Sequence, residues 1–165
     1  GTLQQNGASI GGDNKPAILV NRNTTQTFNE ATNVKIQFNN EIYDTDNTFD
    51  SSSNYRWTPG VAGKYFMSAT ADIMVGGSHA FVCRIEIYKN GSRLTRVHRQ
   101  LTSYYLPAST VQNMTISCHD NASTTDYYEV YVNANNESGN NDCTVGSQFS
   151  SAAYSSHFGG YKIIT

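Results

Sequence analysis

Histidine and cysteine spacing is the first place to look for chemistry in this chain. A metal site built from one local segment needs histidines a few positions apart, or cysteine pairs, because neighbouring ligands must reach one ion. Neither pattern occurs, and the sequence also lacks a nucleophile elbow, a phosphate-binding loop and a dinucleotide-binding glycine motif. The sequence therefore predicts no catalytic constellation and no transition-metal site. The histidines are His79, His98, His119 and His157.

The acidic residues are the second candidates. Two carboxylates about 5 to 10 Å apart could cleave a glycosidic bond, but no motif places a pair at that separation, so an enzyme is not predicted. Asp44, Asp46 and Asp50, with Asn47 and Asn54, could supply oxygen ligands to calcium. The segment lacks the glycine and the closing glutamate of a helix-loop-helix calcium site. We favour the alternative that these side chains cap turns, and no other cofactor is predicted.

Three cysteines leave the redox state open. Cys83, Cys118 and Cys143 are odd in number and far apart in the sequence. One alternative is a single disulfide with one remaining thiol. The other is three thiols, since Cys83 and Cys118 lie in apolar, strand-like runs where cysteine packs as a small hydrophobic side chain. No oxidising compartment is inferred.

The charge of the chain argues against nucleic acid as a partner. Only 15% of the residues are charged, and the formal net charge is −2. Nucleic-acid binding needs concentrated positive charge, whereas the densest basic stretch is Arg93, Arg96 and Arg99 with His98. We interpret that stretch as a solvated strand edge. No segment approaches the roughly 20 apolar residues of a membrane helix, so membrane insertion is not predicted.

Alternation of apolar and polar residues dominates the chain from Lys15 onward. Cys83, Ile85 and Ile87 alternate with other residues, and similar short runs are separated by Asn, Gly and Asp. A period of two is typical of a strand with one buried face, and Asn90-Gly91 between two such runs predicts a tight hairpin. About eight to ten strands without a helical segment predict an all-β sandwich or jelly roll. Residues 1–14 are polar and predict a linker or the end of a stalk, followed by one domain over residues 15–165.

The central segment carries a pattern that resembles a known family. The run from Phe38 to Asp44, then Phe49, then the run from Trp57 to Met67 resemble the globular head domain of complement component one q, which is related to tumour necrosis factor. Further matches follow in the order of the family over residues 15–165. They are Ala17–Val20 as the first strand, Lys89-Asn90-Gly91 as a hairpin, Asp126 with Glu129–Val132, and Phe158-Gly159-Gly160-Tyr161 as the closing strand.

This resemblance implies a ten-stranded antiparallel jelly roll that packs as a homotrimer, so that each chain has two identical chains as partners. A sandwich of this size buries limited surface, and three copies around an axis could bury an additional aromatic face. The pattern alone does not separate core from interface. Tyr65, Phe66, Tyr131 and Tyr161 are candidates for either role.

The amide-rich sequence resembles the heads of bacteriophage and other viral fibres, although Thr125 stands where the family has a glycine. Our hypothesis is a non-enzymatic trimeric head of a phage or viral fibre or spike, at the virion surface or outside cells, that binds a receptor. The partner would be a cell-surface glycan or protein, contacted by loops distal to the termini. Tyr beside Asn and Ser is typical of adaptable recognition surfaces, although Tyr is also a common strand residue. The residues predicted for this contact are Tyr104, Tyr105, Asn121, Tyr127 and Asn136.

Two alternatives stay open. The same fold could serve as a structural trimerisation, capping or decoration module without a ligand. It could also be a secreted pattern-recognition protein or cytokine-like ligand of a eukaryote, in which Asn-x-Ser/Thr sequons would accept glycans. The sequons begin at Asn23, Asn90, Asn113, Asn121 and Asn136.

Overall fold

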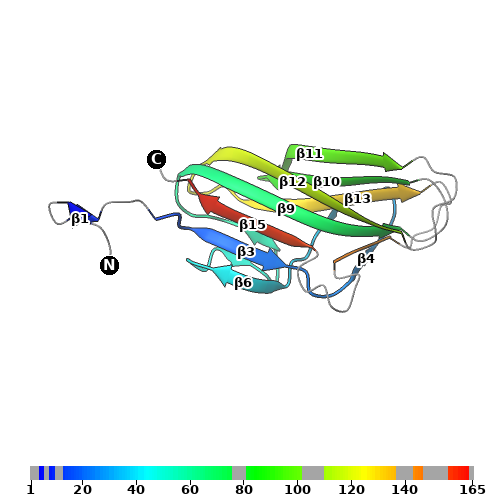
Figure 1. Ribbon diagram of the computed structural model, residues 1–165, viewed down its shortest axis with the longest axis horizontal. Coiled ribbons are helices and arrows are strands. Elements are labelled where there is room, and N and C mark those ends of the chain that lie inside the picture. Colours follow the sequence, from blue (N-terminus) through cyan, green and yellow to red (C-terminus); the bar gives the residue numbers. More distant parts are fainter. Residues whose placement is uncertain are drawn as a thin grey trace.

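The chain folds into two antiparallel β-sheets that pack face to face (Figure 1). The structure is a computed structural model that describes the backbone of residues 4–5, 8–9, 13–75, 81–101, 110–136, 143–146 and 156–163. Side chains are described for residues 13–75, 82–96, 111–135, 143–146 and 156–163. These residues contain no helix, and hence none long and apolar enough to cross a membrane.

The first sheet, called here the β9 sheet, is built around the long strand β9. Its strands follow one another in the order β4, β14, β9, β15, β3 and β6, and β12 pairs with β9 as well. The bounds are β3 (Ala17–Asn21), β4 (Gln26–Phe28), β6 (Asn40–Asp44), β9 (Gly63–Val75), β12 (Thr110–Ala122), β14 (Cys143–Val145) and β15 (His157–Lys162).

The second sheet, called here the β10 sheet, covers the inner side of the first. Its order is β11, β10, β13, β8 and β7, with β5 also paired to β13. The bounds are β5 (Val34–Lys35), β7 (Phe49–Asp50), β8 (Arg56–Trp57), β10 (Phe81–Lys89), β11 (Ser92–Leu101) and β13 (Tyr128–Asn136). Two short strands, β1 (Gln4–Gln5) and β2 (Ala8–Ser9), pair with each other. The predicted division between residues 14 and 15 stays a prediction.

The predicted fold class is confirmed: this is an all-β, antiparallel jelly-roll sandwich. More strands occur than the ten expected because short pairings such as β7 with β8 form strands of their own. The predicted hairpin is present, since Asn90 and Gly91 join β10 to β11 with φ angles of 52° and 75°. Only a residue that tolerates positive φ fits such a turn, which is why Asn-Gly is favoured there.

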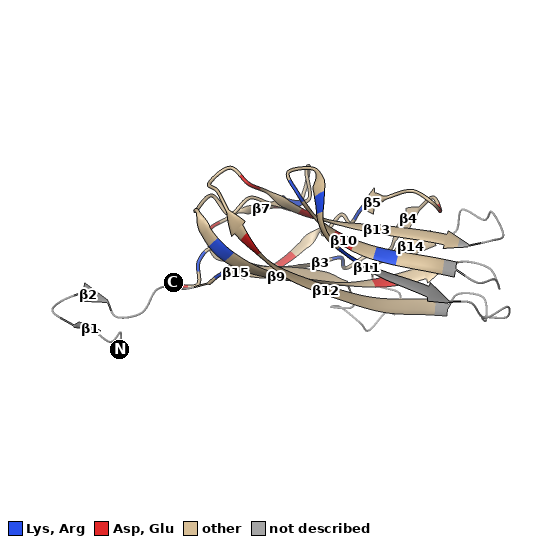
Figure 2. Ribbon diagram, turned by 90° about the horizontal axis from the view of Figure 1, so that it is seen from above, with Lys and Arg blue, Asp and Glu red and all other residues tan. Residues whose placement is uncertain are grey.

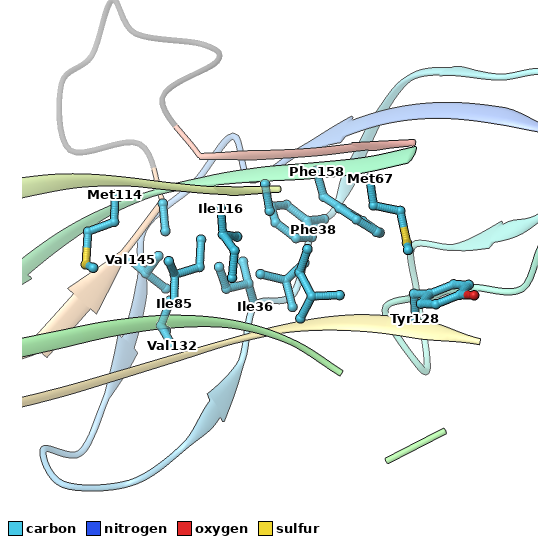
Figure 3. Close-up of a cluster of buried hydrophobic side chains, with 14 of the residues drawn as sticks. Ile36, Phe38, Met67, Ile85, Met114, Ile116, Tyr128, Val132, Val145 and Phe158 are labelled. Carbon is cyan, nitrogen blue, oxygen red and sulfur yellow. The ribbon is translucent and has the colours of Figure 1, made fainter. Parts of the chain in front are cut away.

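Alternation along the strands builds the core between the sheets. In β9, Tyr65, Met67 and Ala69 point inward and are fully buried, while Phe66 and Ser68 between them point outward. Trp57, the only tryptophan, is also fully buried and packs edge-on against Tyr65 with ring centroids 5.4 Å apart. Figure 3 shows side chains from both sheets meeting in this layer, among them Ile36, Phe38, Met67, Ile85, Met114, Ile116, Tyr128, Val132, Val145 and Phe158.

The two ends of the sandwich differ in what they carry. At the end called here the terminal pole, β3 begins and β15 ends (Figure 1). The Lys162 amide donates there to the Pro16 carbonyl at 3.2 Å. β9 also begins there, and β12 and β10 end there. At the opposite end, the distal pole, β9 ends and β10 begins. Figure 2 shows long neutral stretches along the strands between the poles, with charged residues at scattered positions.

Candidate functional site

The outward side of the β9 sheet carries a group of aromatic and apolar side chains, called here the aromatic face. Its members come from different strands because the register places them in adjacent rows: His119 lies opposite Phe66, and Phe66 lies opposite Tyr161. In the next row Leu19 lies opposite Tyr43. The aromatic face therefore consists of Leu19, Tyr43, Phe66, His119 and Tyr161.

Ring contacts hold the aromatic face together without burying it. The Phe66 ring centroid lies 5.2 Å from that of His119 and 5.5 Å from that of Tyr161. Tyr161 and Tyr43 keep 40% and 48% of their surface exposed. Between them is a hollow of about 200 Å³. Its lining residues are Ile18, Leu19, Tyr43, Phe66, Ser68, His157, Gly159, Gly160 and Tyr161.

On the distal side of the aromatic face the next rows of the sheet carry short, uncharged side chains, whereas the exposed Lys64 lies on its terminal side. Ser68 lies between Ser117 and Gly159 in the register, and the hydroxyls of Thr70 and Thr115 are 3.0 Å apart. Such short side chains let another surface approach the sheet closely. A contiguous exposed apolar area rimmed by polar groups is typical of a protein interface. The geometry therefore favours a docking surface over a catalytic site.

A second exposed apolar feature lies at the edge of the same sheet. Strand β6 is the last strand of the β9 sheet and pairs only with β3 among the described strands. Ile42 on this strand is 39% exposed, and Tyr43 beside it belongs to the aromatic face. An edge strand with exposed apolar side chains is prone to contact another chain.

A polar cluster at the terminal pole is closed and structural. The Lys89 ammonium lies 2.7 Å from an Asp120 oxygen and 3.0 Å from an Asp126 oxygen. The Tyr128 hydroxyl donates to Asp120 at 2.6 Å, and the Asn90 amide donates to Asp126 at 2.7 Å. Burial lowers the pKa of Lys89, but the two carboxylates outweigh burial and raise it. These bonds tie the β10–β11 hairpin to the turn between β12 and β13.

The five residues predicted for ligand contact do not gather at one place. Asn121 and Tyr127 lie at the terminal pole, where the Asn121 carbonyl accepts from Lys89 and the Tyr127 ring stacks under the Arg56 guanidinium at 4.4 Å. Asn136 ends β13 at the distal pole, and its side chain is not described. Tyr104 and Tyr105 lie outside the described residues. The expectation that all five share the distal end therefore does not hold for Asn121 and Tyr127, and a binding role for the five stays a prediction.

The candidate calcium ligands cap turns. Asp44 accepts hydrogen bonds from the Thr48 amide at 2.6 Å and the Phe49 amide at 2.7 Å. Asp50 accepts from the amides of residues 52, 53 and 54, which hold the pKa of its carboxyl below the usual range. Asp46 accepts from the Thr45 hydroxyl. In the described ranges no three His, Cys, Asp or Glu side chains gather as metal ligands.

The four residues proposed for core or interface separate into three environments. Tyr65 is core, and its hydroxyl donates to the Val61 carbonyl at 2.7 Å. Phe66 and Tyr161 belong to the aromatic face. Tyr131 lies on the outward side of the β10 sheet, where its ring packs at a tilt against that of Tyr88, with the centroids 4.3 Å apart. Period-two alternation separates Tyr65 from Phe66, but it gives no means to tell which outward side another chain covers.

Three members of the aromatic face were not predicted from the sequence. His119 shares one side of β12 with Ser117 and Asn121, which indicates an outward position but not a neighbour. Tyr43 and Leu19 meet only through the pairing of β3 with β6, whose register shifts at a bulge. No local signal in the sequence reports that register. The aromatic face is therefore a product of topology.

The cysteines form no disulfide. Cys83 and Cys143 are buried, and Cys118 is half-buried. Burial, and then the charge of Asp120, raise the pKa of the Cys118 thiol to about 11. The thiol therefore stays protonated at neutral pH and is a weak nucleophile.

No family model matches the sequence, and no curated protein matches it either. Solved structures do match in fold. The globular domain of zebrafish complement 1qA protein is 15% identical with a TM-score of 0.56, covering 91% of this chain and 98% of that one.

Two further structures belong to the tumour necrosis factor group. Eiger TNF from S. frugiperda is 10% identical with a TM-score of 0.62, covering 90% of this chain and 92% of that one. Murine APRIL is 9% identical with a TM-score of 0.58, covering 89% and 98%. The resemblance stated from sequence is thus confirmed at the level of fold. The chain has the jelly-roll fold of the complement 1q globular domain and of TNF.

Proposed function

We propose that this domain is a non-enzymatic head that assembles as a homotrimer through its aromatic face and binds a partner outside cells. The observation that carries the assembly is the exposed aromatic face itself. Phe66, His119 and Tyr161 lie in ring contact on the outward side of the β9 sheet, beside a hollow that another chain could fill. Water contact with these rings is unfavourable, and covering them by a like copy removes it.

Two different apolar surfaces support a closed ring over a symmetric dimer. The aromatic face offers a broad surface, and the β6 edge offers the protruding Ile42. When unlike surfaces of identical chains meet, the contact is heterologous and repeats until the ring closes. The fold shared with the complement 1q and TNF structures supports three as the number of copies.

Solution mass tests the assembly directly. Light scattering at micromolar concentration should give three times the chain mass for the natural sequence. The double variant Phe66→Ser with Tyr161→Ser should give one chain mass while its circular dichroism stays all-β. Tyr127→Ser removes a tyrosine stacked elsewhere and should stay trimeric. A monomeric natural protein, or a double variant that still assembles, would contradict this use of the aromatic face.

The identity of the partner separates two forms of the proposal. The likeness to TNF and complement 1q structures favours a secreted, cytokine-like or pattern-recognition ligand. The neutral, amide-rich surface and the polar residues 1–14 support the head of a phage or viral fibre. In both, the site of action lies outside cells, and the partner is a cell-surface glycan or protein.

Glycosylation distinguishes these two forms. In a secretory pathway the sequons at Asn23 and Asn121, which are exposed, should carry glycans. Asn90 and Asn113 are exposed too, but their amide nitrogens donate to Asp126 and Asp72 at 2.7 and 2.6 Å, and a glycan on either nitrogen would compete with that contact. Mass spectrometry of the natural protein would show this pattern for a secreted ligand. A chain without glycans would favour the fibre head.

A further inference from the structure

The outward side of the β10 sheet carries three arginines, and two of them lie at one buried carboxylate. On β10, Arg84, Glu86 and Tyr88 point away from the core, because the residues between them are core residues. On β11, Arg96 pairs in register with Glu86, and Arg93 pairs with Tyr88. This surface, together with Tyr131 on β13, is called here the arginine face. It lies on the opposite side of the sandwich from the aromatic face, so assembly through the latter leaves it open.

The charges of the arginine face do not balance. Glu86 is only 1% exposed, and its Oε1 accepts from the Nε of Arg96 while one Arg93 nitrogen lies 3.8 Å away. Arg84 makes one long contact of 3.4 Å to the Asn133 side-chain oxygen. Arg93 and Arg96 thus lie at one carboxylate, and Arg84 lies at none among the described contacts, so the three guanidiniums exceed the one carboxylate by two positive charges. Guanidinium groups held in place by one carboxylate keep further N–H donors for a second anion.

The buried carboxylate also has an unused acceptor. Glu86 Oε2 is shielded from solvent and has no hydrogen-bond partner in the described part of the chain. A buried acceptor without a donor is rare in folded proteins and often indicates a missing ligand or water. The Arg93 and Arg96 side chains that lie at the other oxygen of this carboxylate keep 48% and 36% of their surface exposed. A ligand that brings a hydroxyl donor together with an anion would satisfy both groups.

Aromatic rings complete the arginine face. Tyr88 and Tyr131 pack at a tilt with ring centroids 4.3 Å apart, and the Asn33 amide donates to the Tyr88 hydroxyl at 3.1 Å. Burial, and then a hydrogen-bonding interaction with the Glu86 side chain, raise the pKa of Tyr88, so its phenol stays neutral. Next to the rings, Lys35 and Glu129 pair at 2.8 Å and cancel each other. The positive charge is therefore local, beside aromatic surface, rather than a stripe of the kind that follows a nucleic-acid backbone.

We infer that the arginine face binds a polysaccharide that carries sulfate or carboxylate groups. The guanidiniums of Arg84, Arg93 and Arg96 bind the anionic groups, Glu86 Oε2 accepts a sugar hydroxyl, and the tyrosine rings contact the apolar side of a sugar ring. This inference rests on the proposed function, because it names the partner class of the head. The hydroxyl groups of a sugar chain can donate to Glu86 Oε2, which the phosphates of a nucleic-acid backbone cannot do.

The test uses the full chain and four defined polymers. Interferometry at several salt concentrations measures binding to four immobilised polymers: dextran sulfate, neutral dextran, poly-glutamate and single-stranded oligothymidine. Dextran sulfate should bind most tightly, with an affinity that falls as salt rises, and neutral dextran should not bind. Arg93→Gln with Arg96→Gln should weaken dextran sulfate binding by about tenfold or more, since each lost bidentate contact to an anion costs roughly that factor. Lys15→Gln, which removes an exposed charge elsewhere, should change it by less than about twofold.

Other results would overturn the inference. The inference is wrong if neutral dextran binds as tightly as dextran sulfate, or if poly-glutamate or oligothymidine binds more tightly than dextran sulfate. It is also wrong if the double variant binds dextran sulfate with unchanged affinity. If the double variant fails to fold with Glu86 left unpaired, Arg84→Gln decides, because Arg84 does not contact Glu86 and its loss should still weaken binding severalfold. Light scattering on the same samples separates the two proposals: a trimer that ignores dextran sulfate refutes only the arginine face.

Discussion

Replacing Gly160 by alanine tests the packing of the core at its tightest point. A Cβ at this position would lie 2.4 Å from Cζ3 of Trp57, 3.0 Å from its Cη2 and 3.2 Å from Cγ of Met67. The Trp57 ring cannot move away, because Tyr65 and Phe158 pack against it at 5.4 and 6.3 Å. One of these elements has to shift to admit a methyl group.

The magnitude follows from two opposing effects. Overpacking a core costs about 1 to 3 kcal/mol, and a clash with a ring enclosed on several sides belongs at the upper end. Alanine in a strand recovers about 0.5 to 1 kcal/mol relative to glycine. The net expectation is a loss of about 2 kcal/mol, which for a chain of this size lowers the unfolding midpoint by about 4 to 8 °C.

Tryptophan fluorescence measures this change at its source, since Trp57 is the only tryptophan in the chain. Gly159→Ala is the matched control one residue earlier, because its Cβ would lie 3.4 Å from its nearest neighbours, an ordinary contact. The control should unfold within about 1 kcal/mol of the natural protein. All proteins are compared at one concentration, since assembly makes unfolding depend on it. A Gly160→Ala variant with unchanged midpoint and unchanged emission would refute the reasoning.

Three other perturbations probe separate parts of the fold. The pKa of Asp126 is lowered, most strongly by the hydrogen bond from the Asn90 amide. The ionised carboxylate therefore stabilises the fold fully above the unfolded-state pKa of 3.8, and this stabilisation is lost as the pH falls below that value. Asp126→Asn should flatten this part of an acid-unfolding curve. The Cys118 thiol has a pKa of about 11, so at pH 8 it should react with a disulfide reagent more slowly than a small-molecule thiol does. Its reaction rate should rise roughly tenfold per pH unit. Fast labelling at pH 8 would contradict its burial. Gly146→Ala should lower the free energy of unfolding by more than about 2 kcal/mol, because φ is 121° and a Cβ would lie 2.4 Å from the Thr24 carbonyl oxygen. An unfolding midpoint equal to that of the natural protein would show that this backbone can relax.

Local patterns in the sequence predicted the local structure well. Cys83, Ile85 and Ile87 are all buried, as their alternation predicts, and Asn90-Gly91 forms the hairpin. Both features depend on neighbours in the chain. The division into two sheets depends on which strands pair, and 13 consecutive residues of β9 pair with β12 far along the chain. For that arrangement the family resemblance supplied the information that periodicity lacks.

The candidate sites were harder to predict because they join distant segments. Tyr161 and Phe66 were recognised as core or interface candidates, but their partner His119 follows only from the β9–β12 register. The arginine face shows the same limit. Arg93 and Arg96 were correctly placed as an exposed strand edge, yet their convergence on Glu86 requires the bulge-shifted pairing of β10 with β11. Composition reports which groups exist, whereas register decides which of them meet.

The shared position of the chain ends has a mechanical consequence. Strands β3 and β15 are antiparallel neighbours that enter and leave the sandwich at the same pole. Drawing the two ends apart would therefore peel the ladder between them one hydrogen bond after another, at low force. Tension between a tether at that pole and a ligand held farther along the sandwich instead runs parallel to the strands and loads many bonds together. A tether at that pole, as predicted for residues 1–14, would therefore load the domain along its stronger direction, whereas separating its own ends would load the weaker one.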